Sequence, residues 1–325
     1  YAAPGWFAAS WRAARKGEWG EHDVEELLAD GTRVVVADQI EAGVDILSDG
    51  ELRRQRFVYE MFDRLDGIER VPPRRRLGIA GYDMAPHFAV RDRIEAPNGL
   101  GAVEEFEALQ RLAPARAIKL AIPGPLTFGG FIDAGARDGI DLLNDLIRVV
   151  NRELKALAAA GATYLQLDEP GLPSAPHGLS MAEAADMINR AFEGVKARRA
   201  LHVCFGNNAG RPMADRGMDR LMPAIEALKC DQLVLEFANR EFAGVELLST
   251  LSDKFDIAAG VVDVKNFRIE TPEDVAARIA RCLEHMPPEK LTVTADCGFS
   301  ALPRYLARAK LDAMVAGARL AREAL

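Results

Sequence analysis

The chain has 325 residues, of which 49% are hydrophobic and 28% are charged, a composition typical of a soluble globular protein with ample material for a core. Its formal net charge of −8 argues against a large nucleic-acid-binding surface, which would need a basic face. No stretch approaches the roughly 18 uninterrupted apolar residues of a membrane span, and the N-terminus shows no signal-peptide pattern. We therefore expect a cytoplasmic protein that binds neither nucleic acid nor a membrane.

Short apolar runs that end in polar or glycine-containing loops recur along the chain. They lie at residues 45–47, 118–122, 164–167, 200–203, 232–235, 257–262 and 291–294. Because these runs are largely apolar rather than strictly alternating, they predict parallel strands that are buried on both faces.

Helical patterns lie between the predicted strands. Apolar residues recur with a helical period over 143–158. Ser180 and Glu183 form a capping-box pair before the next helical pattern, and Thr271 followed by Pro272 is a strong helix start. The alternation of strands and helices predicts a parallel α/β sheet.

Seven predicted strands are one short of a closed barrel. The sequence opens at Tyr1 rather than Met, so we expect a further strand before this residue. Eight strands would form a (β/α)8 TIM barrel, and we expect residues 1–325 to be one catalytic domain. An open, doubly wound sheet is the alternative.

Residues of metal-binding or acid–base type follow the predicted strands, where a barrel of this class builds its active site. They are Asp49, Glu51, Asp168, Glu169, His202, Cys204, Glu236 and Cys297. His202 and Cys204 are two positions apart on one strand, so both side chains point to the same face. One histidine, two cysteines and a carboxylate suit Zn²⁺. From spacing alone, ordinary packing of these side chains remains the alternative.

The motifs in chain order match a known family. They are Asp49-Gly50-Glu51, Pro123-Gly124-Pro125, Leu167-Asp168-Glu169-Pro170, His202-Val203-Cys204, Leu235-Glu236, Gly260-Val261-Val262-Asp263 and Asp296-Cys297-Gly298. Over nearly its whole length the chain resembles the C-terminal catalytic half of cobalamin-independent methionine synthase. It more closely resembles the short single-barrel members of that group, within the uroporphyrinogen decarboxylase/methionine synthase-like superfamily.

The resemblance implies a zinc-dependent S-methyltransferase that activates homocysteine as a zinc thiolate and yields methionine. It implies that His202, Cys204, Glu236 and Cys297 bind the zinc. It also implies that Glu51 and Asp168 receive the amino group of homocysteine. The expected partners are a small-molecule thiol and a methyl donor, with a corrinoid protein as a candidate donor.

Three departures from the family leave the methyl donor open between a corrinoid and a methylfolate. The tryptophan that stacks on the pterin in folate-using members is absent from 126–131, and a folate-contacting acidic residue is Ser174 here. The histidine proposed as proton donor is Lys265. Lys265 and Asp168 are therefore the candidate catalytic residues, although Lys265 could instead pair structurally with Asp263 or Glu236.

Two other functions remain open at this point. A related zinc thiol transferase of the epoxide–coenzyme M type would bind a sulfonate through basic residues, for which Lys265, Arg53 and Arg54 are candidates. A barrel that binds a tetrapyrrole or corrinoid without zinc, as porphyrinogen decarboxylases do, is the other. The set of cysteine and histidine ligands argues against the latter.

Overall fold

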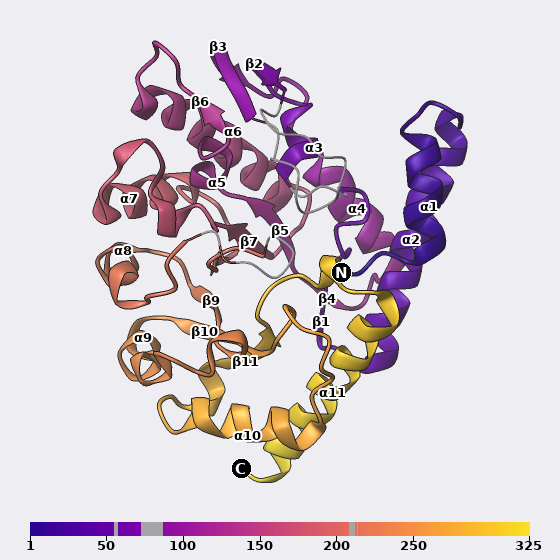
Figure 1. Ribbon diagram of the computed structural model, residues 1–325, viewed down its shortest axis with the longest axis vertical. Coiled ribbons are helices and arrows are strands. Elements are labelled where there is room, and N and C mark those ends of the chain that lie inside the picture. Colours follow the sequence, from indigo (N-terminus) through magenta and orange to yellow (C-terminus); the bar gives the residue numbers. More distant parts are fainter. Residues whose placement is uncertain (55–57, 73–86, 208–211, 213) are drawn as a thin grey trace. The chain divides into compact units, whose positions relative to one another are not determined.

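The computed structural model describes residues 1–54, 58–72, 87–207, 212 and 214–325, and strands alternate with helices along the chain (Figure 1). Its contacts group into two compact units. Unit 1 comprises residues 1–55, 105–120 and 232–325, and unit 2 comprises residues 56–104 and 121–231. A single catalytic domain over 1–325 stays a prediction.

Unit 1 contains the first helices, the last strands and the C-terminal helices of the chain. Its elements are α1 (Gly5–Ala14), α2 (Glu21–Ala42), β1 (Ile46–Leu47), most of α4 (Ala102–Leu112), β4 (Ala117–Ile118), β9 (Gln232–Glu236), α9 (Leu248–Lys254), β10 (Asp256–Val262), α10 (Pro272–Leu283), β11 (Leu291–Ala295) and α11 (Arg304–Glu323). Strand β10 pairs in parallel with both β9 and β11, and β1 pairs in parallel with β4.

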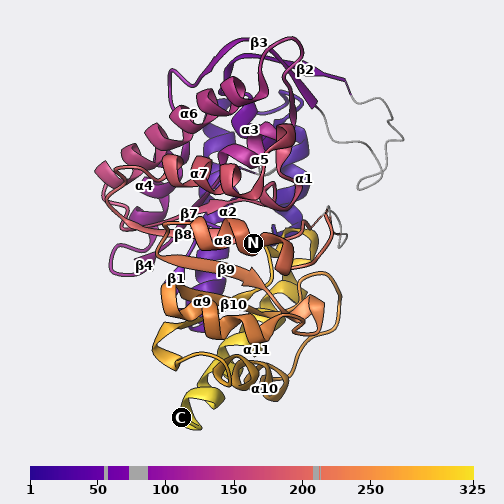
Figure 2. The ribbon, with the colours of Figure 1, turned by 90° about the vertical axis from the view of Figure 1, so that its left-hand side faces the viewer.

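The helices of unit 1 pack on one another and enclose apolar side chains. Helix α2 contacts both α1 and α11, and α11 lies along α10 in both views (Figures 1 and 2). Phe7, Leu27, Val35 and Leu52 form one buried cluster between α1 and α2, at the start of the chain. These contacts fix the turn that follows β1.

Unit 2 contains the middle strands of the chain. Its elements are α3 (Val58–Phe62), β2 (Asp66–Val71), β3 (His87–Glu95), most of β5 (Leu120–Pro123), α5 (Pro125–Gly129), β6 (Ile132–Asp133), α6 (Gly139–Ala159), β7 (Tyr164–Asp168), α7 (Met181–Ala191), β8 (Arg198–Val203) and α8 (Met222–Ala227). Strand β7 lies between β5 and β8 and pairs with β8 in parallel. Strands β2 and β3 form an antiparallel pair.

Each of the seven predicted strands is confirmed, and the one at 118–122 divides into β4 and β5 on either side of Lys119. The helix starts are confirmed as well: Ser180 caps α7 and Thr271 caps α10, each in a capping box. The antiparallel pair β2–β3 was not predicted. Its strands are mostly exposed, so they lack the apolar runs that identified the others.

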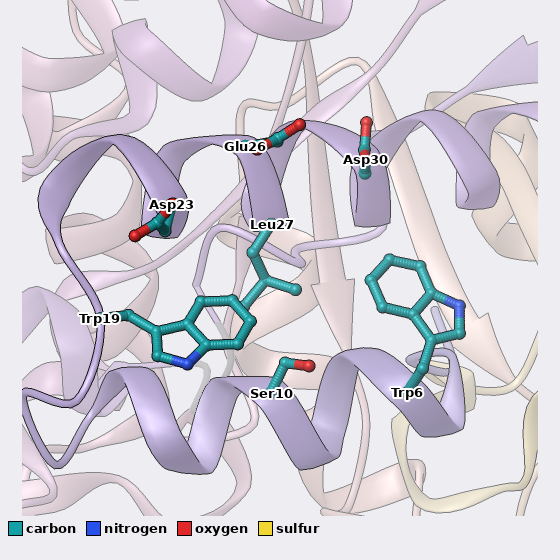
Figure 3. Close-up of a pocket in the computed structure, with 7 residues that line it drawn as sticks. All are labelled: Trp6, Ser10, Trp19, Asp23, Glu26, Leu27 and Asp30. Carbon is teal, nitrogen blue, oxygen red and sulfur yellow. The ribbon is translucent and has the colours of Figure 1, made fainter.

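A surface pocket of about 360 Å³ lies between α1 and α2 (Figure 3). Its lining among the described residues is Trp6, Ser10, Trp19, Asp23, Glu26, Leu27 and Asp30. None of these residues belongs to the predicted metal or substrate site. Within the described part of the chain, no helix is long and apolar enough to cross a membrane.

A buried ion-pair network in unit 1 orders the segment after β10. Lys310 on α11 is fully buried, and its Nζ lies 2.8 Å from Glu270 Oε2. Glu270 Oε1 accepts hydrogen bonds from Arg278 (3.1 Å) and from the backbone N–H of Asp263 (3.0 Å). Because each buried charge has a partner, the network holds the segment that begins at Asp263 against the helices.

We expect Lys310→Met to lower the free energy of unfolding by about 3 kcal/mol, because it leaves the buried Glu270 with only Arg278 as a cationic partner. Urea denaturation would measure the change. The matched control is Arg322→Met on the same helix, which breaks an exposed ion pair with Asp45 and should cost about 0–1 kcal/mol. Equal effects of the two substitutions would contradict the role given to Lys310.

Candidate metal and substrate site

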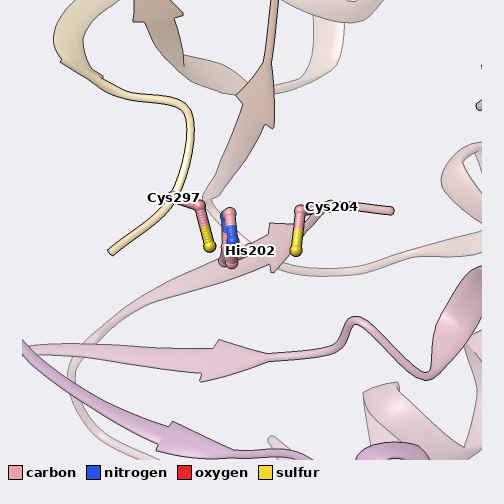
Figure 4. A group of neighbouring side chains, drawn as sticks. All are labelled: His202, Cys204 and Cys297. Carbon is pink, nitrogen blue, oxygen red and sulfur yellow. The ribbon is translucent and has the colours of Figure 1, made fainter. Parts of the chain in front are cut away.

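Strands β7 and β8 of unit 2 present Asp168, His202 and Cys204 at their carboxyl ends. Asp168 is the register partner of His202, and its Oδ1 accepts a hydrogen bond from Gln166 (2.7 Å). His202 and Cys204 are both buried, and their ligand atoms lie within 4.8 Å of each other (Figure 4). A tetrahedral zinc ion with Zn–N and Zn–S bonds of about 2.0–2.3 Å needs these atoms about 3.5 Å apart, so a small movement of the side chains would let one ion contact both.

Glu169 connects the Asp-Glu-Pro motif to the Pro-Gly-Pro turn. Its fully buried carboxyl accepts hydrogen bonds from the backbone N–H of Leu126 (3.0 Å) and from the N–H (2.8 Å) and hydroxyl (2.7 Å) of Thr127. A Cβ at Gly124 would lie 2.1 Å from Glu169 Oε1, so the turn needs glycine there. Burial raises the pKa of Glu169 to about 8, although these hydrogen bonds lower it. Glu169 therefore orders the loop beside Asp168.

The last residue of β9 in unit 1 is Glu236, and it pairs with Lys265. Lys265 Nζ lies 2.9 Å from Glu236 Oε2, with the two side chains only 7% and 1% exposed. Glu236 Oε1 is also buried and has no hydrogen-bond partner among the described residues. The sequence left Asp263 or Glu236 as the partner of the Lys265 side chain, and in the structure the ammonium group pairs with Glu236. Glu236 retains one oxygen that could bind a further group.

Asp296 ties the loop that carries Cys297 to the residues after Glu236. Its carboxyl accepts from the backbone N–H groups of residues 237 (2.9 Å), 238 (2.9 Å) and 239 (2.7 Å), and from the side chain of Asn239 (2.9 Å). Burial raises the pKa of Asp296 to about 7, against the lowering effect of these donors. The ends of β9 and β11 are thus joined, and Cys297 is half-buried.

Glu51 belongs to an acidic cluster in unit 1 that the structure extends beyond the sequence motif. Glu51 and Glu105 each lie 3.5 Å from the guanidinium of Arg54, and Asp49 is buried close by. Burial raises the pKa of Glu105 to about 8, and burial followed by the charge of Glu51 raises that of Asp49. Arg53 also interacts with Asp49 and Glu105, but its guanidinium is hydrogen-bonded to Glu25. The cluster is therefore short of positive charge.

The turn that presents Glu51 is strained. Gly50 and Glu51 both have positive φ values, 72° and 59°. A Cβ at Gly50 would lie 2.4 Å from Val35, so glycine is required there, whereas Glu51 adopts a conformation that side-chain-bearing residues rarely take. Such strain costs on the order of 1–3 kcal/mol and is concentrated at functional sites.

The basic residues considered for a sulfonate are already engaged with carboxylates. Arg53 makes hydrogen bonds of 2.9 and 2.5 Å to Glu25, Arg54 lies between Glu51 and Glu105, and Lys265 pairs with Glu236. An acidic surrounding favours a substrate ammonium over a sulfonate. Among the described residues near Glu51, the charge balance thus argues against the coenzyme M type of substrate.

The sequence did not reveal several of the contacts that order the candidate site. Glu169 and Asp296 lie inside the motifs, but nothing in the sequence showed that their carboxyls bind loop backbones. Glu105 lies on α4 with no motif around it, so only the fold reveals it. The cysteines are all described, and none forms a disulfide. Asp168, His202 and Cys204 belong to unit 2, and Glu51, Glu236 and Cys297 belong to unit 1.

The amino-acid sequence matches a known enzyme family over most of its length. The family model described as "Cobalamin-independent synthase, Catalytic domain" matches residues 8–320. A methionine synthase of Saccharolobus solfataricus is 32% identical over 326 aligned positions, covering 100% of this chain and 93% of the relative. A methionine synthase of Pyrococcus abyssi is 33% identical, covering 100% and 91%.

A solved structure is similar as well. The B12-independent methionine synthase of Shewanella sp. W3-18-1, in complex with selenomethionine, matches with a TM-score of 0.81 and 28% identity. The match covers 94% of this chain and 91% of that one. It confirms the α/β barrel class that the sequence predicted.

Glu169→Gln should destabilise the protein most at low pH. The raised pKa of about 8 means that the stabilisation by protonated Glu169 is complete below the unfolded value of about 4.3 and is lost as the pH rises through 8. The glutamine NH₂ cannot accept where the carboxyl does, at a cost of about 1–3 kcal/mol. Urea denaturation of both proteins should show this difference shrinking between pH 5 and pH 8.5. If the difference in unfolding free energy between the two proteins grew with pH, the raised pKa of Glu169 would be contradicted.

Proposed function

The chain belongs to the cobalamin-independent methionine synthase family, and on that premise we propose that it is a zinc-dependent methyltransferase that converts homocysteine to methionine. The observation that carries the proposal is the donor set at the strand ends. His202 and Cys204 lie together in unit 2, and in unit 1 Glu236 ends β9 and Cys297 follows β11.

In this proposal His202, Cys204 and Cys297, the group drawn in Figure 4, hold one zinc ion. Their two sulfurs and one nitrogen are the donors that zinc prefers. Glu236 is the fourth ligand, which its second carboxylate oxygen supports because that buried atom has no hydrogen-bond partner among the described residues. A zinc ion held by these residues would lower the pKa of a bound thiol enough for the thiolate to form near neutral pH.

We propose that Glu51 and Asp168 bind the ammonium group of homocysteine. The shortage of positive charge around Glu51, Asp49 and Glu105 supports this role, because a bound ammonium would compensate the buried carboxyls. The strained Glu51 turn and the loop ordered by Glu169 keep the two carboxylates in place before the substrate arrives. Such positioning reduces the entropy lost in reaching the reactive geometry.

The methyl donor in this proposal is a corrinoid rather than a methylfolate. Within the turn where folate-using relatives place a pterin-stacking tryptophan, Phe128 is fully buried, with its ring 5.3 Å from that of Phe62. It cannot stack on a ligand without leaving the core. Phe131, which is partly exposed, packs edge-on against Tyr59.

We expect about one zinc per chain in the purified protein, and its loss in both Cys297→Ser and His202→Ala, since each removes a strong donor. Elemental analysis after dialysis would measure this. Cys282→Ser is the matched control, because Cys282 is buried on α10 away from the predicted ligands. Wild-type protein that binds no zinc after reconstitution would overturn the proposal.

Glu51→Gln should raise the KM for homocysteine by about ten- to a hundredfold, because it removes a charge-assisted contact worth about 1.5–3 kcal/mol. Asp168→Asn should act in the same direction. Steady-state assays would use methylcobalamin and methylfolate in turn. Glu69→Gln, which changes an exposed carboxylate paired with Arg91, is the control and should leave KM unchanged. Unaltered kinetics in the two site variants would argue against an ammonium site.

A further inference from the structure

We propose that Lys265 is a positioning residue that receives the carboxylate of Glu236 when the substrate thiol takes its place at the metal. The inference rests on the proposed zinc site and adds to it a role for Lys265, one of the three positions where the chain departs from the family. It assigns Lys265 to the binding of the thiol rather than to proton delivery.

The geometry of the pair supports an exchange between two partners. Glu236 Oε2 lies 2.9 Å from Lys265 Nζ, and both side chains are almost completely buried. Glu236 Oε1 is buried too, with no hydrogen-bond partner in the described parts of the chain. One carboxylate oxygen is thus held by the ammonium group while the other is left for a second cation.

Lys265 is itself held at this place by the fold. Its backbone N–H donates to Asp263 Oδ1 (2.7 Å), and the N–H of Asp263 donates to Glu270 (3.0 Å). Glu270 is anchored by Lys310 on α11. A lysine fixed through this series of contacts meets Glu236 without much loss of side-chain freedom, which makes the pair stronger than an exposed one.

The balance of charge explains why such a partner is needed. When the thiol binds, its proton leaves to solvent and the thiolate replaces one carboxylate, so the charge around the metal is unchanged. Without Lys265, the displaced Glu236 would be a buried anion with no cationic partner, which is strongly unfavourable. Pairing with Lys265 offsets that penalty and shifts the equilibrium toward the thiolate-bound state.

The test measures metal and thiol binding separately, without turnover. Zinc affinity is obtained by chelator competition. Homocysteine affinity is obtained from the sulfur-to-metal charge-transfer absorption of cobalt-substituted protein. Lys265→Met should bind zinc about as tightly as wild type, because Lys265 contacts Glu236 Oε2 and not Oε1, the proposed ligand atom. Its Kd for homocysteine should rise by about ten- to a hundredfold, the range seen when groups that support metal ligands are removed.

Matched variants separate this role from a general loss of structure. Lys265→Arg should restore most of the homocysteine affinity, because the charge remains. In Glu236→Gln the further change Lys265→Met should have little effect on homocysteine affinity, since no displaced anion needs a partner. Lys229→Met, at an exposed lysine, should behave as wild type.

The outcomes distinguish the inference from the function on which it rests. If the wild-type protein binds no metal, the zinc site itself is wrong. If it binds zinc and homocysteine but Lys265→Met leaves the Kd for homocysteine unchanged, only the role of Lys265 is overturned. The same holds if Lys265→Met weakens homocysteine binding equally in the Glu236→Gln background.

Discussion

Buried carboxylates that bind the backbone of neighbouring loops are the interaction on which the candidate site depends. Glu169 accepts from residues 126 and 127, and Asp296 accepts from residues 237–239. Each therefore fixes the loop after one strand to the end of another. Because a buried carboxyl without donors is costly, these loops have one favourable arrangement. Asp168 and Cys297, which adjoin Glu169 and Asp296 in the sequence, are positioned by these contacts.

The buried charges that serve the fold differ in their partners from those proposed to bind the substrate. Glu270 is fully matched by Lys310, Arg278 and a backbone donor, and it serves the fold. Around Glu51, by contrast, the nearby cations leave the pKa values of Asp49 and Glu105 raised. Incomplete compensation at a strand end is what a site for a cationic substrate requires, because the ligand supplies the missing charge. Glu236 is intermediate: its Oε2 pairs with Lys265, and its Oε1 has no hydrogen-bond partner among the described residues.

The similarity to methionine synthases and the physical features of the chain both support the proposed homocysteine methyltransferase. Some residues of the shared motifs order the loops, and others are proposed to bind the metal or the substrate. Gly124 and Glu169 occur in two separate motifs, yet a Cβ at Gly124 would lie 2.1 Å from Glu169 Oε1, so the glycine leaves room for the carboxyl. Lys265, where the chain departs from the family, lies in a buried pair with the acidic residue proposed as the exchangeable ligand. A change at that position therefore alters how the site accommodates a thiol.

The sequence by itself determined the seven strands with apolar runs, the helix starts at Ser180 and Thr271, and the identity of the side chains at the ends of those strands. These are local properties: apolar runs mark buried strands, and capping residues mark helix starts. It did not determine that Lys265 pairs with Glu236, that Glu105 joins Arg54, or that Asp296 holds the loop after β9. These contacts join residues that are 29 to 59 positions apart in the chain. Only the tertiary structure brings them within hydrogen-bonding or ion-pairing distance. Burial then strengthens these contacts, because water no longer competes for the polar groups.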